Sequence, residues 1–213
     1  MAGSNRQSLP EAERTYLNTL QTPFPSIVDG KIETEDFLEA VKGVLVLIEK
    51  FRQVFAPIKF DMWRCLETLE ERYVADKTTY RYLTDMINQE QAEGGMRVTE
   101  SLLWLKRALH FLHSFLQYIV DDTEEDDVEP MLKRAYEETL HRYHGWMAQQ
   151  LMMLLYRMCP RRSEIYRTLA LGHEDREEAV KRTLITFLTE LGANIEHISQ
   201  FYEMHNLESN SWI

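Results

Sequence analysis

The sequence predicts an all-α protein, a two-layer helical sandwich of about eight helices. Apolar residues recur at helical spacing from Thr34 onward, and the Pro and Gly residues separate these periodic segments. No alternating strand pattern or Asn-Gly hairpin competes with the helical pattern. The 213 residues fit one domain, and 44% hydrophobic with 28% charged residues is typical of a soluble globular protein.

The first half of the chain is expected to contain four helices behind a polar extension. Residues 1–30 are predicted to be a partly ordered extension with a short helix over 11–21, and residues 31–213 to form the helical domain. Each helix has its own boundary signal: Thr34 caps a helix that runs to about Gln53, Pro57 opens the next, Thr78 or Thr79 caps one that ends at Gly94-Gly95, and Thr99 starts a fourth.

The second half is expected to contain three helices after an acidic loop over 121–129, which we interpret as solvated. Pro130 opens a long helix that stops before Pro160. This helix places Leu140, His144, Met147, Leu151 and Leu155 in one line. Ser163 caps a short helix that ends near Gly172, and a last helix runs from about Asp175 toward His205.

The helix from Thr99 carries two apolar stripes. Leu102, Leu105, Leu109, Leu112, Leu116 and Ile119 form one of them, and Trp104, Ala108, Phe111 and Phe115 form the other. A central helix between two layers of packing explains this pattern. A helix with one face on the core and the other on a cavity explains it equally well.

Charge and cysteine content narrow the possible partners. A net charge of -11 argues against nucleic acid and against constitutive adhesion to anionic membranes. Cys65 and Cys159 lack CxxC spacing, and no secretory signal is visible, which indicates a cytoplasmic protein. The longest aliphatic run, 44–48, is far shorter than the ~20 residues that span a bilayer. We therefore expect transient association with the cytosolic face of membranes.

Three stretches resemble the glycolipid transfer protein family and occur in the family's order: Pro57-Ile58-Lys59-Phe60-Asp61, Trp104-Leu105-Lys106-Arg107 and Arg142-Tyr143-His144-Gly145-Trp146. Members of this family are all-helical shuttles that hold one sphingolipid and move it between membranes. The resemblance implies a surface headgroup site, a hydrophobic tunnel for the acyl chains, and a protein that is not an enzyme and needs no cofactor or metal.

The resemblance also implies roles for three headgroup residues. Trp104 would stack on the sugar ring, and His144 would bond the ceramide carbonyl oxygen. Asp61 would accept from the ceramide amide and from a sugar hydroxyl. Family members that carry ceramide-1-phosphate have arginine where this chain has Trp104, so a glycosylceramide is the expected ligand.

The family pattern is broken after Asp61. The family has a Gly-Asn pair at the third and fourth positions after its aspartate and a basic residue three further on, whereas this chain has Arg64, Cys65 and Thr68. Cysteine bonds weakly, and threonine offers one short hydroxyl in place of a cation. Arg64 would substitute for the cation, block the site or point to solvent. The chain is then either a diverged member or a variant with a deliberately altered headgroup site.

Further positions follow from the resemblance and the apolar pattern. The tunnel would be lined by Phe55, Ile58, Phe111, Phe115, Leu151 and Met152. Membrane contact would involve Trp146, Tyr156 and Arg157. No protein partner is indicated.

The sequence gives little support to enzymatic or metal-dependent functions. An enzyme using Asp61, Cys65 and His144 lacks a Gly-rich nucleophile turn to supply an oxyanion hole. A di-iron bundle would need two Glu-x-x-His motifs, and only the one from Glu138 to His141 is present. A lipid sensor or scaffold, which binds a sphingolipid without efficient transfer, is the alternative to a carrier.

Overall fold

The computed structural model describes residues 9–19, 22–51, 55–122 and 124–209. Within these residues the chain forms eight α-helices and short 3-10 turns. The α-helices are α1 (Thr34–Lys50), α2 (Ala56–Ala75), α3 (Leu83–Glu93), α4 (Arg97–Asp121), α5 (Glu129–Thr139), α6 (Trp146–Tyr156), α7 (Arg162–Leu169) and α8 (Glu177–Met204). The predicted all-α class and the number of helices are confirmed.

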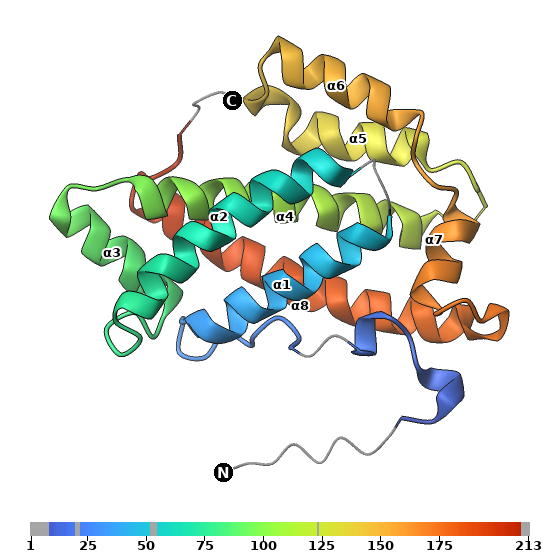
Figure 1. Ribbon diagram of the computed structural model, residues 1–213, viewed down its shortest axis with the longest axis horizontal. Coiled ribbons are helices and arrows are strands. Elements are labelled where there is room, and N and C mark those ends of the chain that lie inside the picture. Colours follow the sequence, from blue (N-terminus) through green and yellow to red (C-terminus); the bar gives the residue numbers. More distant parts are fainter. Residues whose placement is uncertain (1–8, 20–21, 52–54, 123, 210–213) are drawn as a thin grey trace.

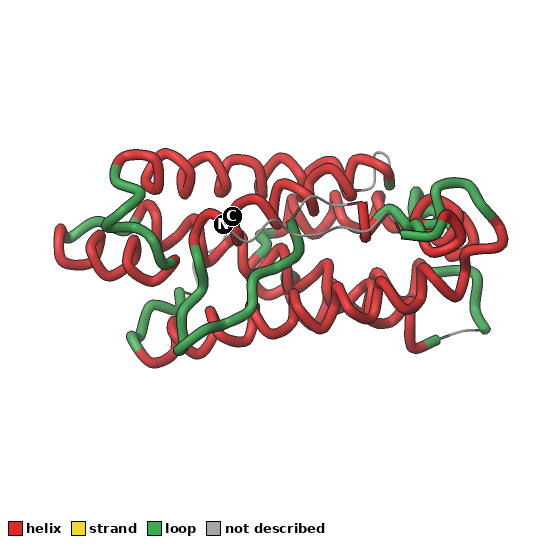
Figure 2. The backbone as a smooth tube through the Cα atoms, turned by 90° about the horizontal axis from the view of Figure 1, so that it is seen from below, coloured by secondary structure: helices red, strands yellow, loops and turns green. Residues whose placement is uncertain are grey.

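The helices form two layers around α4. In Figure 1, α1 and α2 lie in front of α4 and α8, and Figure 2 shows the two layers edge-on. Helix α4 packs against α2, α5 and α8. Every member of its first apolar stripe is buried, and in its second stripe only Trp104 is partly exposed. Helix α4 is therefore the central helix, and it also borders the cavity described below.

Two helix starts differ from the prediction. Thr34 is the first residue of α1 and does not cap it: its hydroxyl donates to the Tyr80 carbonyl at 2.7 Å. Helix α4 begins at Arg97 instead of Thr99. The buried Glu90 carboxylate of α3 accepts from the backbone N–H groups of Val98 and Thr99 at 2.8 and 2.7 Å. These are unpaired donors of the first helical turn, which every helix must satisfy.

Gly94 and Gly95 make the α3–α4 connection possible. Gly94 ends α3 in the left-handed conformation at φ 76°, as the predicted Gly-Gly end requires. A Cβ on Gly95 would lie 2.9 Å from Cγ of Glu90, so a side chain there would displace the carboxylate that caps α4. The predicted start of this third helix was wrong, since α3 begins at Leu83 and the Asp76 carboxylate accepts the N–H groups of Thr78 and Thr79 in a turn.

The predicted long helix from Pro130 is also wrong. Helix α5 ends at Thr139, a 3-10 turn covers His141–Tyr143, and α6 begins at Trp146. His144 and Gly145 have extended backbone, with ψ of 129° and 169°. The expected line through Leu140, His144 and Met147 therefore does not exist, and His144 lies in a turn instead of on a helix face.

The ends of the chain pack partly against the helices. The expected helix over 11–21 is limited to 3-10 turns at Glu11–Glu13 and Leu17–Thr19, and residues 20–21 lie outside the described residues. Phe24 is buried between Phe37 and Phe187, with ring centroids 6.0 and 5.9 Å away. Helix α1 ends at Lys50, and the expected end at Gln53 is outside the described part. None of the described helices is both long and apolar enough to cross a membrane.

Candidate functional site

One cavity of about 800 Å³ lies between α2, α4 and the segment from Leu140 through α6. Its charged lining comes mainly from the later turns of α2 and the first turn of α4, which Figure 1 shows at the same end of the molecule. Its apolar lining comes from the start of α2, from Ala108 and from α6, and includes Ile58, Met62, Leu151 and Met152. The cavity is therefore amphipathic along its length.

The structure brings all six predicted headgroup residues to the wall of this cavity. Helix α2 contributes four residues, α4 contributes one, and the turn before α6 contributes one: Asp61, Arg64, Cys65, Thr68, Trp104 and His144. Their roles toward a ligand remain predictions.

His144 is held in the turn by contacts that the sequence pattern did not reveal. The Tyr136 hydroxyl lies 3.0 Å from its Nδ1, and Gln149 donates to its carbonyl oxygen at 2.8 Å. Burial, and secondarily the nearby His141, lower the pKa of His144, which favours the neutral imidazole. A neutral ring that accepts the Tyr136 hydroxyl at Nδ1 carries its proton on Nε2, where it can donate to a carbonyl oxygen of a ligand.

Trp104 lies beside His144 and covers a buried guanidinium. The two rings are 6.5 Å apart at an interplanar angle of 20°, and Tyr143 meets the indole edge-on at 6.2 Å. The Arg107 guanidinium lies 4.9 Å from the Trp104 ring centroid and 3.5 Å from that of Tyr143. The indole is thus supported by aromatic and cation–π contacts. Sequence reasoning missed Tyr136 and Tyr143, because neither spacing nor residue type marks them.

The α2 wall is held less firmly. Asp61 lies at the solvent-exposed edge of this wall. The protein atoms that partly bury its carboxyl raise the pKa of that group, and Arg64 opposes this effect. The Thr68 hydroxyl donates within the helix to the Arg64 carbonyl at 3.2 Å. Burial, and secondarily Asp61, raise the pKa of Cys65 to about 11, so this cysteine stays a thiol at neutral pH. A thiolate nucleophile paired with His144 therefore receives no support.

Arg64 lines the cavity from an exposed position, with its guanidinium carbon 5.9 Å from the centroid of the Phe60 ring. The Arg64 side chain therefore lies at the solvent-facing edge of the cavity.

Three of the expected tunnel residues line the cavity and three do not. Ile58, Leu151 and Met152 are on its wall. Phe55, Phe111 and Phe115 are fully buried, and the Phe55 ring centroid is 6.4 and 5.7 Å from those of the other two. These rings pack together because apolar side chains in a protein interior fill space almost as densely as molecules in a crystal.

The expected membrane-contact residues also divide. Trp146 is 72% exposed and Arg157 is exposed, whereas Tyr156 is only 8% exposed and packs against Tyr136. The buried position of Tyr156 corrects its assignment to the surface. Helix α6 and the residue pair that follows it expose further large apolar side chains that the prediction did not include: Met147, Met153, Leu154 and Met158. Several exposed large apolar side chains on one short helix indicate an interaction surface.

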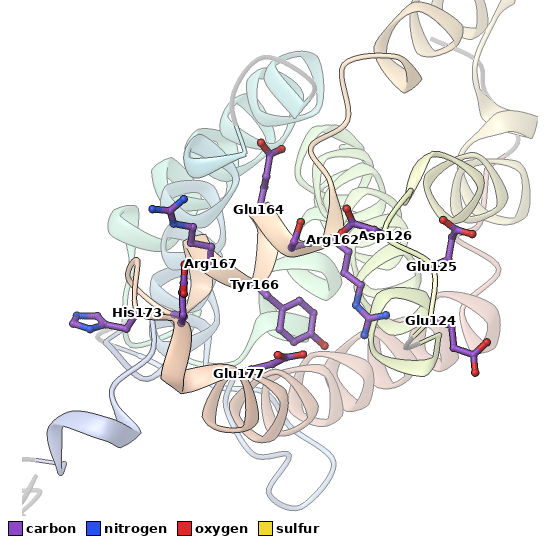
Figure 3. Close-up of a pocket in the computed structure, with 12 residues that line it drawn as sticks. Glu124, Glu125, Asp126, Arg162, Glu164, Tyr166, Arg167, His173 and Glu177 are labelled. Atoms are coloured by element: carbon purple, nitrogen blue, oxygen red, sulfur yellow. Dashed lines mark hydrogen bonds between the residues drawn. The ribbon is translucent and has the colours of Figure 1, made fainter.

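A second hollow, of about 520 Å³, lies between the acidic loop and α7 and is shown in Figure 3. The Glu124 and Glu125 side chains point away from its centre in that view. Asp126 instead ties the loop to α7, since its carboxylate accepts the Ser163 N–H at 2.9 Å. Arg162 of α7 also donates to the Asp122 carbonyl oxygen, so the acidic run is a solvated loop that is anchored to α7 through Asp122 and Asp126. Within the described residues, no group of His, Cys, Asp and Glu side chains is arranged to hold a metal ion.

Fold and cavity together define a class: an all-helical protein with an amphipathic cavity beside a helix that exposes large apolar side chains. Comparison with known proteins names the family. The family model for glycolipid transfer protein (GLTP) matches residues 32–171, and the chain belongs to this family.

The chain is also similar to individual proteins. The dog pleckstrin homology domain-containing family A member 8 is 30% identical over 92% of this chain, which spans only 40% of that relative's length. Zebrafish glycolipid transfer protein is 30% identical over 84% of this chain and 91% of its own. The solved structure reported in "How FAPP2 Selects Simple Glycosphingolipids Using the GLTP-fold" is 28% identical, with a TM-score of 0.85 over 94% of this chain and 100% of the other.

Proposed function

We propose that this chain is a non-enzymatic carrier that transfers sphingolipids, preferentially glycosylceramides, between membranes. The observation that carries the proposal is the meeting of Asp61, Trp104 and His144 on the wall of one amphipathic cavity. A ring for stacking, a carboxylate acceptor and an imidazole donor are the groups that a sugar and a ceramide amide require. The relatives named for glycolipids and glycosphingolipids support the same ligand class.

The apolar part of the ligand would enter where Ile58, Leu151 and Met152 line the cavity. Longer acyl chains would then have to displace the packed rings of Phe55, Phe111 and Phe115. Each of these rings is held by non-directional apolar contacts, which hydrocarbon can replace at little cost.

Delivery would use the exposed apolar surface of α6, with Trp146 at its start beside His144 and Arg157 just after its end. Tryptophan and arginine both suit the interface between headgroups and hydrocarbon. We propose that the chain works in the cytoplasm and touches the cytosolic face of membranes only transiently.

A lipid sensor or scaffold with an altered headgroup site is the second candidate, favoured by one observation. The family's amide and basic side chains on α2 are replaced here by Cys65, whose thiol bonds weakly, and Thr68, whose hydroxyl is used within the helix. Such a protein would bind a sphingolipid without transferring it efficiently.

Vesicle-to-vesicle transfer of fluorescent lipids separates these candidates. The panel comprises glucosyl-, galactosyl- and lactosylceramide, ceramide-1-phosphate and a phosphatidylcholine. Transfer of the glycosylceramides alone supports the proposed carrier. Retention of a glycosylceramide without transfer supports the sensor. Binding of none of these lipids by a chain that is helical by circular dichroism contradicts both.

A further inference from the structure

The end of the described chain, residues 207–209, is anchored to α4 directly behind Trp104. Lys106 and Arg107 both pair with the carboxylate of Glu208: the Lys106 ammonium contacts one oxygen, and Arg107 Nη2 lies 3.4 Å from the other. Arg107 also donates to the Ser209 carbonyl oxygen. A segment that follows α8 is therefore tied to the helix that carries the stacking ring.

Among the described residues, two buried cations share one carboxylate at this anchor. The side chains of Lys106 and Arg107 are only 8% and 4% exposed, and Glu208 is the carboxylate with which both of them form ion pairs. Buried cations need nearby anions, because removal from water is costly. Burial lowers the pKa of Arg107, with Tyr143 and then Glu208 acting in the opposite direction.

Arg107 also has unused donors. Its Nε and Nη1 atoms are buried and have no hydrogen-bond acceptor among the described residues. Its guanidinium contacts the Trp104 ring, which lines the cavity. A planar guanidinium with free N–H groups is the preferred protein partner of phosphate.

Resting on the proposed function, we propose that Glu208 is a built-in counter-ion that sets the headgroup selectivity of the cavity. With Glu208 in place, Arg107 is paired with a carboxylate and stays behind Trp104, and the cavity takes neutral sugar headgroups. Without this carboxylate, Arg107 has an uncompensated charge and free donors one ring away from the headgroup, and the cavity takes phosphate-bearing headgroups.

A merely structural anchor makes a different prediction. If Glu208 only fixed the chain end, its loss would loosen the Trp104 wall and weaken every lipid alike. A counter-ion makes glucosylceramide and ceramide-1-phosphate respond in opposite directions. The ratio of the two transfer rates is therefore the decisive readout.

The test uses the full chain with Glu208→Gln, which removes the charge and keeps the shape. Glu203→Gln on the exposed side of α8 is the matched control. Transfer of labelled glucosylceramide and ceramide-1-phosphate between phosphatidylcholine vesicles is measured, with circular dichroism to confirm the helical fold. We expect the ratio of ceramide-1-phosphate to glucosylceramide transfer to rise by about tenfold in Glu208→Gln, because a charge-assisted hydrogen bond contributes about that factor to affinity. The ratio should stay constant in Glu203→Gln.

The double variant Arg107→Gln, Glu208→Gln should not show this rise in the ratio of transfer rates. Two results for Glu208→Gln overturn this proposal and leave the proposed function standing. One is an unchanged ratio of transfer rates with glucosylceramide transfer like that of the wild type, and the other is an equal loss of transfer for both lipids. A wild-type chain that binds neither lipid overturns the proposed function and this proposal together.

Discussion

The two walls of the cavity differ in how their side chains are held. On the side of α4 and the turn before α6, Trp104 and His144 are supported by Arg107, Tyr143 and Tyr136. On the side of α2, Asp61 is exposed and Thr68 bonds its own helix.

The difference teaches which substitutions the fold tolerates. A change on the first wall disturbs several buried partners, whereas a change on the solvent-facing side of α2 disturbs few. The resemblance to the family predicts the same division, with a changed pattern at Arg64, Cys65 and Thr68 and a retained pattern at Trp104 and His144.

The largest effect on transfer should come from removing Trp104 or His144, the central side chains of the wall formed by α4 and the turn before α6 (the firm wall). We predict that Trp104→Ala and His144→Leu each reduce glycosylceramide transfer by a factor on the order of a hundred, because each removes a contact at the centre of the site. The helical content by circular dichroism should change little. Trp104→Phe, which keeps a stacking ring, is the control. Near-normal transfer in both variants would mean that the headgroup lies elsewhere.

Restoring the family pattern on the weaker wall should have a smaller effect of opposite sign. The double variant Cys65→Asn, Thr68→Lys supplies an amide and a cation at the cavity wall, and we predict a rise in glycosylceramide affinity of roughly tenfold. Equilibrium binding measured by energy transfer to a labelled lipid tests this, with each single variant as a control. A loss of affinity would show that the site is adapted to the residues it has.

Delivery can be separated from headgroup binding at Trp146. We predict that Trp146→Ala slows transfer by about fivefold and leaves equilibrium binding unchanged, because an exposed indole stabilises contact with a membrane surface. Trp63→Ala removes a second exposed indole, on α2, and serves as the matched control. Equal slowing by both variants would extend the contact surface to α2, and no slowing by either would remove α6 from it.

The smallest predicted effect is a dependence of the free energy of unfolding on pH, through His144. Burial lowers the pKa of His144 below its ordinary value of about 6.5, so the unfolded chain binds more protons than the folded one in this range. The contribution of His144 to stability is therefore complete above pH 6.5 and is lost as the pH falls below it.

His144→Asn removes this titration. The free energy of unfolding of the wild type should decline more steeply than that of the variant between pH 7.5 and 5.5. Parallel curves from urea unfolding at each pH would contradict a neutral His144. Burial also lowers the pKa values of His110 and His113, so only the difference between wild type and variant isolates His144.

Much of the fold follows from the sequence. Periodic apolar residues predict the central helix α4, Pro57 marks the start of α2, and Gly94 marks the end of α3. These signals are local, because a helix end depends on backbone conformation and on residues within one turn of it. The stretches around Asp61, Trp104 and His144 also identify the family, and the structure brings these three residues to one cavity.

Tertiary structure alone decided the rest. Helical spacing from Leu140 through His144 to Leu155 predicts one helix, yet the helix breaks at His144 and Gly145. Tyr136 and Gln149 hold the resulting turn. Glu90 caps α4 from the preceding helix. The pairing of Glu208 with Lys106 and Arg107 joins residues 102 and 101 positions apart in the chain. Buried polar groups must find partners wherever the fold brings them, and local sequence carries no record of that choice.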